Sequence, residues 1–542
     1  MVKQIQPVMI RSAISGAGQA PDKPPDKWQR IRKMPARQRG GAGMQSGRHS
    51  TGMGSRLMYG AGEFFSGGAF VIINSFFTVF LIKAMGMPAA LAGTVPLIGH
   101  IWDAVTDPIM GNITDRTSAK MGAKRFYMLI GSFATALTFI TLWVPFSTDR
   151  PVTMFIFYVA MYCLFSTGST ILMVPYNGLL PDMVDDYDTR SRFSNVRMIW
   201  STLGAMVCGV VPTLLISDTT KAGVYLRCGI IFGLLFLISC LITVAGTWEH
   251  HHAPVKNRVI HSFDHAASAF RSRSFRLFIG IYLTGQCGMD FVSGMAVYYV
   301  DDVINGYQNH YFTYLMAALV LAQLIGMLIW GPVMARTSKR TTILIGAPIR
   351  IVSTLLLLPF SHEGASIYPI LALAVGIGIG NAATLTSIFS IMADMPDVDE
   401  LITSIHRPGV VSGMSTFARK ISSGLSAWLI GILLTAAGYS EKLANEGARQ
   451  SAFTQKGISM IFIFMPVILC VFLFICGYRF PIMEKEFNIV KKEISRRRGE
   501  DSSSATPEEI RVCERVTGMS YDKLWDSRNQ WVGHGPHAEE AD

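Results

Sequence analysis

Charged residues are scarce in this chain of 542 residues, because Asp, Glu, Lys and Arg together make up only 16% of it. Soluble domains carry about 25% charged residues, so the composition excludes an ordinary water-soluble protein. Half of the residues are hydrophobic, and they gather in runs of about 20 residues, the length of a helix that crosses a bilayer. The alternation that is typical of transmembrane strands is absent.

Motifs for metal or covalent chemistry are also missing. The eight cysteines include no CxxC pair and no metal-ligand spacing, and most stand singly inside apolar runs as small packing residues. No Ser-His-Asp set and no phosphate-binding loop is present. We therefore expect no enzyme, no cofactor and no resident metal. The net charge of +11 does not indicate nucleic acid, because the basic residues gather at the chain ends and in alternate loops.

Twelve apolar runs predict an all-α membrane protein with twelve transmembrane helices. Their approximate bounds are 58–82, 88–110, 126–147, 152–180, 193–216, 223–247, 276–300, 311–335, 341–360, 366–392, 410–438 and 455–480. The chain is expected to divide into a disordered basic tail (1–54), a six-helix bundle (55–248), a middle loop (249–275), a second six-helix bundle (276–480) and a polar C-terminal tail with a short helical stretch (481–542).

Lys and Arg are concentrated in every second loop. Four stand in 115–125, five in 256–276 and three in 336–340, whereas four loops on the other side hold only Lys83 and Arg150 between them. Basic loops stay in the cytoplasm. We therefore expect a monomer in the bacterial cytoplasmic (inner) membrane with both chain ends on the cytoplasmic side.

Three short motifs recur in the same order in the two halves. GEFFSG (62–67) returns as MDFVSG (289–294), and DRTSAKMGAKRFYMLIG (115–131) returns as ARTSKRTTILIG (335–346). LPDMVDDYDTRSR (180–192) resembles ADMPDVDELITSIHR (393–407). Two parallel six-helix repeats are the organisation of the major facilitator fold, in which the solute site lies between the halves near mid-membrane.

Six ionisable side chains fall inside apolar runs, where a charge costs several kcal/mol and therefore marks a functional candidate. They are Glu63, Asp103, Asp107, Arg197, Asp290 and Lys420. The two aspartates at 103 and 107 are one helical turn apart, which puts their carboxylates about 6 Å apart on one face. At an effective dielectric near 20 they repel by about 3 kcal/mol. The pair is expected to hold one proton or one Na⁺.

Several neighbours complete this hypothesis. Thr106 and Thr170 would add hydroxyl oxygens to a cation site, whereas permanent pairing of the two aspartates with Arg197 and Lys420 is the structural alternative. Glu63 and Asp290 occupy matching places near the start of helices in the two repeats. They either stabilise those helix ends or line the solute path.

The basic loop at 115–125 suggests a role in gating and not in binding the solute. We expect Asp115, together with Arg116 and Arg125, to pair with neighbouring helix ends and to control gating. These side chains would not touch the solute.

These segments are similar to the glycoside–pentoside–hexuronide:cation symporter family of the major facilitator superfamily, whose type member is melibiose permease. The similarity spans about residues 55–480 and is carried by YGAGEFFSGG (59–68), IWDAVTDPIMGNITDRTSAKMGAKRFYMLIG (101–131), VPYNGLLPDM (174–183) and MADMPDVDELITSIHRPGVVSGMSTFARKISSG (392–424). The resemblance implies H⁺- or Na⁺-coupled symport of a sugar, glycoside or sugar acid by alternating access.

The resemblance also implies residue roles. Asp103 and Asp107 match the two cation carboxylates of the family, with Thr106 and Thr170 beside them. Arg197 matches an arginine that contacts sugar, and Lys420 matches a lysine near the cation site.

The sugar-binding set of melibiose permease is only partly present. Met173 stands in place of an aspartate that serves both cation and sugar, Ser66 and Gly67 replace a Lys-Asp pair, and Asn177 replaces a tryptophan. We therefore expect a small polar solute other than melibiose, with Glu63 or Asp290 supplying the missing acceptors. The lost carboxylate favours H⁺ over Na⁺.

Two other functions stay open. The apolar replacements suit a carrier for an amphipathic solute of the lysolipid type, coupled or uncoupled. A sensor that does not transport would need a cytoplasmic signalling domain, and the C-terminal tail is short and polar for that task.

Overall fold

The computed structural model describes residues 52–117, 119–184, 187–249, 268–405 and 407–530. The predicted N-terminal tail (1–54) therefore lies almost wholly outside the described residues, as does most of the predicted middle loop. Within the described part, every regular element is helical.

The first half contains six long helical segments, the first of which is interrupted by two π-helical turns. Their bounds are α2 (Met53–Ala61), α3 (Glu63–Ile72), η1 (Ile73–Phe77) and η2 (Phe80–Ala84) for the first segment, then α4 (Ala89–Arg116), α5 (Ala123–Thr141), α6 (Pro151–Met183), α7 (Tyr187–Leu215) and α8 (Ala222–Gly246).

The second half repeats this plan. Its bounds are α10 (Arg273–Tyr298) continued by the π-helical turn η3 (Tyr299–Ile304), the short η4 (Tyr307–Asn309), α11 (Tyr311–Arg336), α12 (Lys339–Leu355), the short η5 (Leu358–Phe360), α13 (Ile367–Thr403), α14 (Pro408–Ala436), α15 (Glu441–Asn445) and α16 (Ala452–Arg479). The twelve predicted spans are therefore matched by twelve long helical segments in the described residues.

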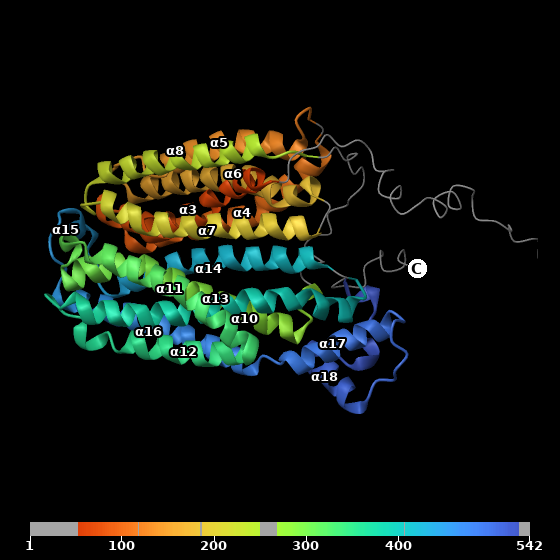
Figure 1. Ribbon diagram of the computed structural model, residues 1–542. Coiled ribbons are helices and arrows are strands. Elements are labelled where there is room, and N and C mark those ends of the chain that lie inside the picture. Colours follow the sequence, from red (N-terminus) through yellow and green to blue (C-terminus); the bar gives the residue numbers. More distant parts are fainter. Residues whose placement is uncertain (1–51, 118, 185–186, 250–267, 406, 531–542) are drawn as a thin grey trace, which may run out of the picture. The chain divides into compact units, whose positions relative to one another are not determined.

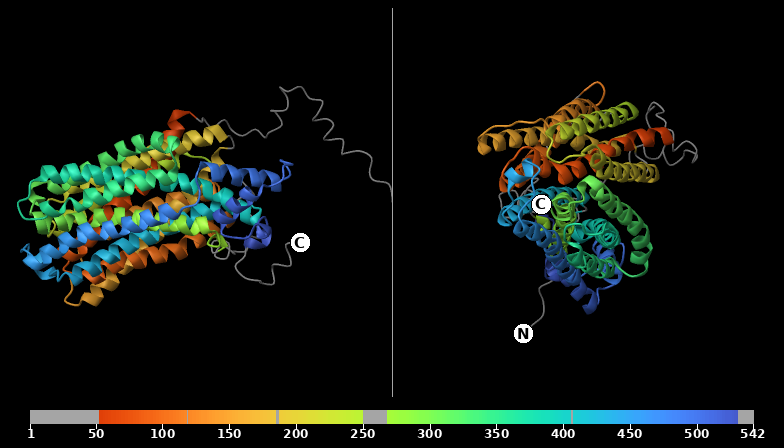
Figure 2. Two further views of the ribbon diagram at one scale, coloured as in Figure 1. Left: turned by 90° about the horizontal axis from the view of Figure 1, so that it is seen from below. Right: turned by 90° about the vertical axis from the view of Figure 1, so that its left-hand side faces the viewer.

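Helix packing in one half has its counterpart in the other. The contacts of α4 with α6, α5 with α6, α5 with α8 and α3 with α7 recur as α11 with α13, α12 with α13, α12 with α16 and α10 with α14. Across the halves, α4 packs on α14 and α7 packs on α11, and Figures 1 and 2 show the two helix groups side by side. This arrangement confirms the predicted fold class of two pseudo-symmetric six-helix halves.

Eight of the described helices are long and apolar enough to cross a membrane by length and composition. The helices that carry Glu63, the Asp103–Asp107 pair and Asp290 are not among these eight. Arg197 and Lys420, by contrast, stand in two of these eight helices, α7 and α14. A charged side chain in a membrane-spanning helix costs free energy, so such side chains are found mainly at functional sites.

One end of the bundle carries α15 and the opposite end carries the two C-terminal helices α17 (Glu484–Arg497) and α18 (Pro507–Thr517), with the short turns η6 (Tyr521–Lys523) and η7 (Ser527–Gln530) (Figure 1). We call these the α15 end and the α17 end. The predicted polar tail is thus largely folded. A capping box between Thr506 and Glu509 starts α18, and hydrogen bonds from the Thr506 backbone, Lys492 and Arg496 lower the pKa of Glu509 to about 2.

The C-terminal segment docks on α13, which runs to Thr403 and so extends beyond the predicted bound of 392. The backbone N–H groups of Trp525 and Asp526 donate to the carbonyls of Leu401 and Ile402. These two carbonyls lie in the last turn of α13, where helical partners are lacking. The segment therefore caps α13 from outside, which stabilises its extra turns.

Glu493 holds this segment together. Its side chain is 1% exposed and accepts hydrogen bonds from Arg496, Arg497 and Tyr521. Hydrogen bonds to a charged group contribute about 1.5–3 kcal/mol. We expect Glu493→Gln to raise hydrogen exchange in α17 and in residues 521–530 by about tenfold or more, measured by mass spectrometry.

Glu500→Gln is the matched control, since Glu500 is an exposed carboxylate in the loop after α17. Exchange in α17 should stay at the wild-type rate in this variant. Equal exchange in the two variants would contradict the structural role of Glu493.

Candidate functional site

The two faces of α4 differ in chemistry. Ile101, Val105 and Ile109 are each about half exposed, and their spacing of four forms an apolar stripe on the outside of the bundle. Asp103 is only 2% exposed. The carboxylates of Asp103 and Asp107 instead point toward α14 of the other half, where they meet Lys420.

Lys420 bridges both carboxylates. Its Nζ atom lies 2.6 Å from Oδ2 of Asp107 and 3.3 Å from Oδ2 of Asp103. From α6, the Thr170 hydroxyl oxygen lies 2.8 Å from Oδ1 of Asp107 and 3.3 Å from Oδ1 of Asp103. The hydroxyl oxygens of Thr106 and Thr170 are 3.4 Å apart. The structure thus brings all four predicted cation-site residues together around one ammonium group.

The charges in this cluster do not cancel. Two carboxylates and one ammonium leave one negative charge, which is costly away from water. Thr170 has a single hydroxyl proton, so it donates to only one carboxylate at a time. Asp107 has the shorter contacts to both Lys420 and Thr170, so Asp103 is the less satisfied of the two and also the more buried.

His100 approaches Asp103 from one turn earlier in α4. Its Nδ1 atom lies 3.9 Å from Oδ2 of Asp103 and has no hydrogen-bond partner among the described residues. Its Nε2 atom lies 3.5 Å from the hydroxyl of Tyr162. A buried imidazole therefore borders the carboxylate that is least well neutralised.

Arg197 lies in a separate group within the first half. It forms an ion pair with Glu63, donates to Oδ1 of Asn177 at 2.5 Å and stacks its guanidinium over the ring of Tyr176 at 4.8 Å. The structural alternative paired both Arg197 and Lys420 with the two aspartates. The structure shows this pairing for Lys420, whereas Arg197 pairs with Glu63 instead. Three predicted solute residues, Glu63, Arg197 and Asn177, share one site.

Asp290 is paired with a residue that the sequence reasoning missed. It forms a two-pronged ion pair with Arg419 of α14 and accepts from Asn74 of the first half at 3.4 Å. Asp290 lies in the middle of α10 and not near its start, so helix-end stabilisation does not account for it. The pairing of Arg419 with Asp290 parallels that of Arg197 with Glu63 in the first half.

Met173 belongs to neither polar group. Its side chain packs against the apolar core of the first half, one turn beyond Thr170 and one turn before Asn177. The structure therefore puts an apolar side chain between the cation cluster and the Arg197 group on α6.

The predicted gating residues are only partly described. Asp115 and Arg116 stand in the last turn of α4, and their side chains lie outside the described part of the structure. Arg125 donates to the carbonyl of Val244 at 2.9 Å and so ties the start of α5 to the end of α8.

A symmetric pair of lysines was missed next to the predicted gating residues. Lys124 pairs with Asp182 and donates to the Gly178 carbonyl. In the second half, Lys339 pairs with Asp394 and donates to the Ser390 carbonyl. Each pair joins two helices of one half at the α17 end.

The bridging role of Lys420 can be tested by stability. Lys420→Met leaves Asp103 and Asp107 facing each other without a counter-charge, and breaking such a buried pair costs about 3 kcal/mol. We expect the free energy of unfolding in detergent to fall by about that amount. The double variant Lys420→Met/Asp107→Asn should recover most of it. A double variant as unstable as the single one would reject the bridge.

The chain is similar to known proteins. The family described as MFS/sugar transport protein matches residues 58–484. The chain is 24% identical to the isoprimeverose transporter of Lactiplantibacillus pentosus, over 76% of this chain and 85% of that one. It is 23% identical to the sodium-dependent lysophosphatidylcholine symporter 1 of Mus musculus, over 80% of this chain and 86% of that one.

Solved structures share the fold. A bacterial homologue of the human lysosomal transporter Spinster, in an inward-facing and unoccupied conformation, superposes with a TM-score of 0.58 at 13% identity, covering 85% of this chain and all of that one.

Proposed function

Since this chain belongs to the MFS/sugar transport protein family, we propose that it is a cation-coupled symporter that carries a sugar, glycoside or sugar acid by alternating access. The chain is a multi-pass membrane transporter and not an enzyme. Beyond membership of the family, we propose the coupling to a cation, the class of solute and the location in the bacterial cytoplasmic membrane. The Lys and Arg distribution supports an orientation with the α17 end in the cytoplasm.

The bridge from Lys420 to Asp103 and Asp107 carries this proposal. It joins α14 of one half to α4 of the other and retains one negative charge. A cation that neutralises this charge changes the interaction between the halves, because it weakens the hold of the carboxylates on the ammonium group. If the cation favours the conformation that binds the solute better, then by linkage the solute raises the affinity for the cation by the same factor.

The geometry favours a proton over Na⁺. A proton on Asp103 would let this carboxyl donate to Thr170, whose own proton serves Asp107. The net charge of Asp103, Asp107 and Lys420 would then be zero. The contacts of Thr170 with both aspartates and of Lys420 with Asp107 would each have a hydrogen-bond donor. Na⁺ would need several oxygen ligands in space that the Lys420 ammonium occupies, and that ammonium repels it.

The Arg197 group supports a polar solute. Glu63, Asn177 and Arg197 offer acceptors and donors close together, as sugar hydroxyls require. Tyr176 adds an aromatic face. The isoprimeverose transporter among the relatives supports a glycoside.

The coupling step can be tested with purified protein in liposomes. Asp103→Asn removes the proposed proton acceptor, so solute accumulation driven by an imposed proton gradient should fall at least about tenfold, whereas solute exchange at equal concentrations on both sides should persist. Asp218→Asn is the control, since Asp218 sits in a loop and pairs with Lys221. Full gradient-driven accumulation by Asp103→Asn would reject the proposal.

An amphipathic solute is the second candidate. A lysophosphatidylcholine symporter is similar to this chain over most of its length, and Met173 places an apolar side chain between the two polar groups of α6. In this case the Arg197 group would bind a polar head and the apolar side chains would face a tail.

Competition separates the two solutes. We expect glycosides and sugar acids, and not lysolipids, to inhibit uptake, with Arg197→Lys weakening their apparent affinity at least about tenfold because the two-pronged geometry of the guanidinium is lost. Arg449→Lys, at an exposed ion pair, should leave affinity unchanged. Inhibition by lysolipids alone would favour the second candidate.

A further inference from the structure

A second cluster of one lysine and two aspartates lies at the α15 end. Lys83 of η2 places its Nζ atom 2.7 Å from Asp301 and 2.8 Å from Asp302, both in η3. The Lys83 side chain is 3% exposed and that of Asp302 is 9% exposed. Lysine and aspartate are seldom buried this deeply unless they are paired.

This cluster joins the two halves with the polarity of the Lys420 bridge reversed. At the Lys420 bridge the first half supplies carboxylates and the second half supplies the ammonium, whereas here Lys83 belongs to the first half and both aspartates belong to the second. Both clusters contain two carboxylates for one ammonium. Here Thr219 donates to Asp301 at 3.0 Å and Tyr439 donates to Asp302 at 3.3 Å, which stabilises the additional negative charge.

Further contacts seal the halves around this cluster. Asn445 of α15 donates to the carbonyls of Lys83 and Ala84, and Tyr307 donates to the carbonyl of Ile216 at 2.8 Å. Nearby, α4 and α14 approach so closely that a methyl group on Gly93 would meet the Ala427 carbonyl oxygen at 2.3 Å. The α15 end is therefore closed by contacts between the halves.

The local backbone suits a contact that must form and break. Both η2 and η3 are π-helical turns at the ends of matching helices, and such turns are rare and often mark functional sites. The net contribution of a buried ion pair is close to zero, because lost hydration offsets the attraction between charges. Opening returns all three charged groups to water, so the closed and open arrangements differ little in free energy.

We infer that Lys83, Asp301 and Asp302 form a latch that closes the α15 end and must release when this end opens. Thr219 supports the latch through Asp301, and Tyr439 supports it through Asp302. The inference concerns the conformation of the two halves, so its test needs no solute and is independent of the proposed coupling ion.

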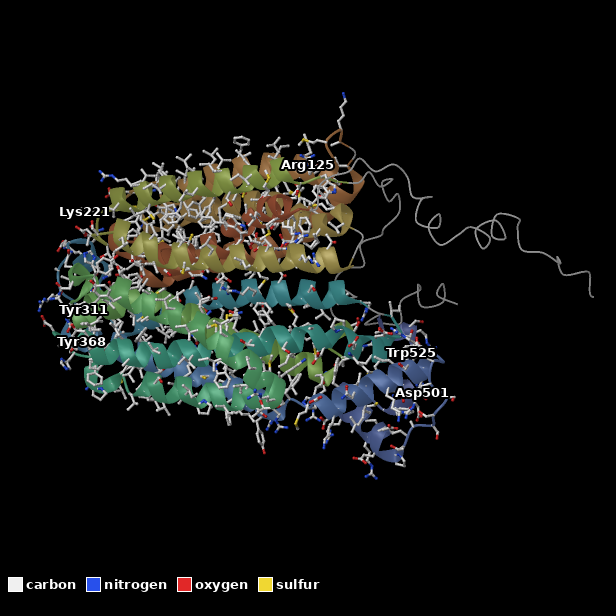
Figure 3. All side chains as sticks on the ribbon, in the orientation of Figure 1. Arg125, Lys221, Tyr311, Tyr368, Asp501 and Trp525 are labelled. Carbon is white, nitrogen blue, oxygen red and sulfur yellow. The ribbon has the colours of Figure 1, made fainter. Side chains whose placement is uncertain are left out.

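Spin labels can report the state of the latch. Lys221 and Tyr368 lie at the α15 end in different halves (Figure 3), and both are exposed. Cysteines at these two positions, in a background with Cys163→Ser and Cys476→Ser, would carry the labels. Pulsed electron resonance on the full chain in lipid nanodiscs then gives the distribution of distances across this end.

Lys83→Met removes the ammonium from the buried carboxylate of Asp302 and from that of Asp301, which is about a quarter exposed, and should favour the open end. We expect the ratio of short to long distances to fall by about 100-fold. The triple variant Lys83→Met/Asp301→Asn/Asp302→Asn has no charge to expel and should return to the short distance. Arg449→Gln is the control, because it removes a cation at the same end from an exposed pair within one half.

A conservative variant tests the latch if Lys83→Met does not fold. Tyr439→Phe removes only the hydroxyl that donates to Asp302 and should lower the same ratio about tenfold. Distances in Lys83→Met or Tyr439→Phe that match those of Arg449→Gln would overturn the inference. A triple variant that stays open would overturn it as well, since closure would then not depend on these charges.

Discussion

One ammonium group held between two carboxylates from the other half is the interaction on which the proposed coupling depends. Lys420 makes this contact with Asp103, which is buried, and with Asp107, which is about a quarter exposed. Because the charges do not balance, the cluster is sensitive to any added cation. Because it spans the halves, a change in its charge changes how they pack. The proposed coupling of the ion to the conformation would act through this contact.

The remaining ion pairs recur at matching places in the two halves. The ion pairs Arg197–Glu63 and Arg419–Asp290 join matching helices within each half, and Lys124–Asp182 and Lys339–Asp394 do the same at the α17 end. Pairs inside a half hold it as a rigid body. The two lysine clusters between the halves are of a different kind, since relative motion of the halves must strain or break them.

Sequence reasoning identified most of the charged groups but not their partners. Hydropathy located Glu63, Arg197 and Lys420, because a charge in an apolar run stands out. Arg419 was overlooked beside Lys420, and its place opposite Asp290 came only from the packing of α10 on α14. The bundle bounds were close, but α13 extends beyond the apolar run since Arg407 and Arg498 pair with its terminal Asp399 and Glu400. The C-terminal tail folds because α13 gives it backbone carbonyls to cap.

The sequence by itself determined the number of helices, the twofold repeat and the shared face of Asp103 and Asp107, because these follow from hydropathy and from the 3.6-residue period within a single helix. Only the tertiary structure decided which cation meets which carboxylate. Hydropathy and charge alone left both Arg197 and Lys420 open as partners of the aspartate pair, and Lys420 is joined to it across more than 300 residues. Helix periodicity fixes the face on which a side chain stands, whereas the packing of the helices fixes what stands opposite.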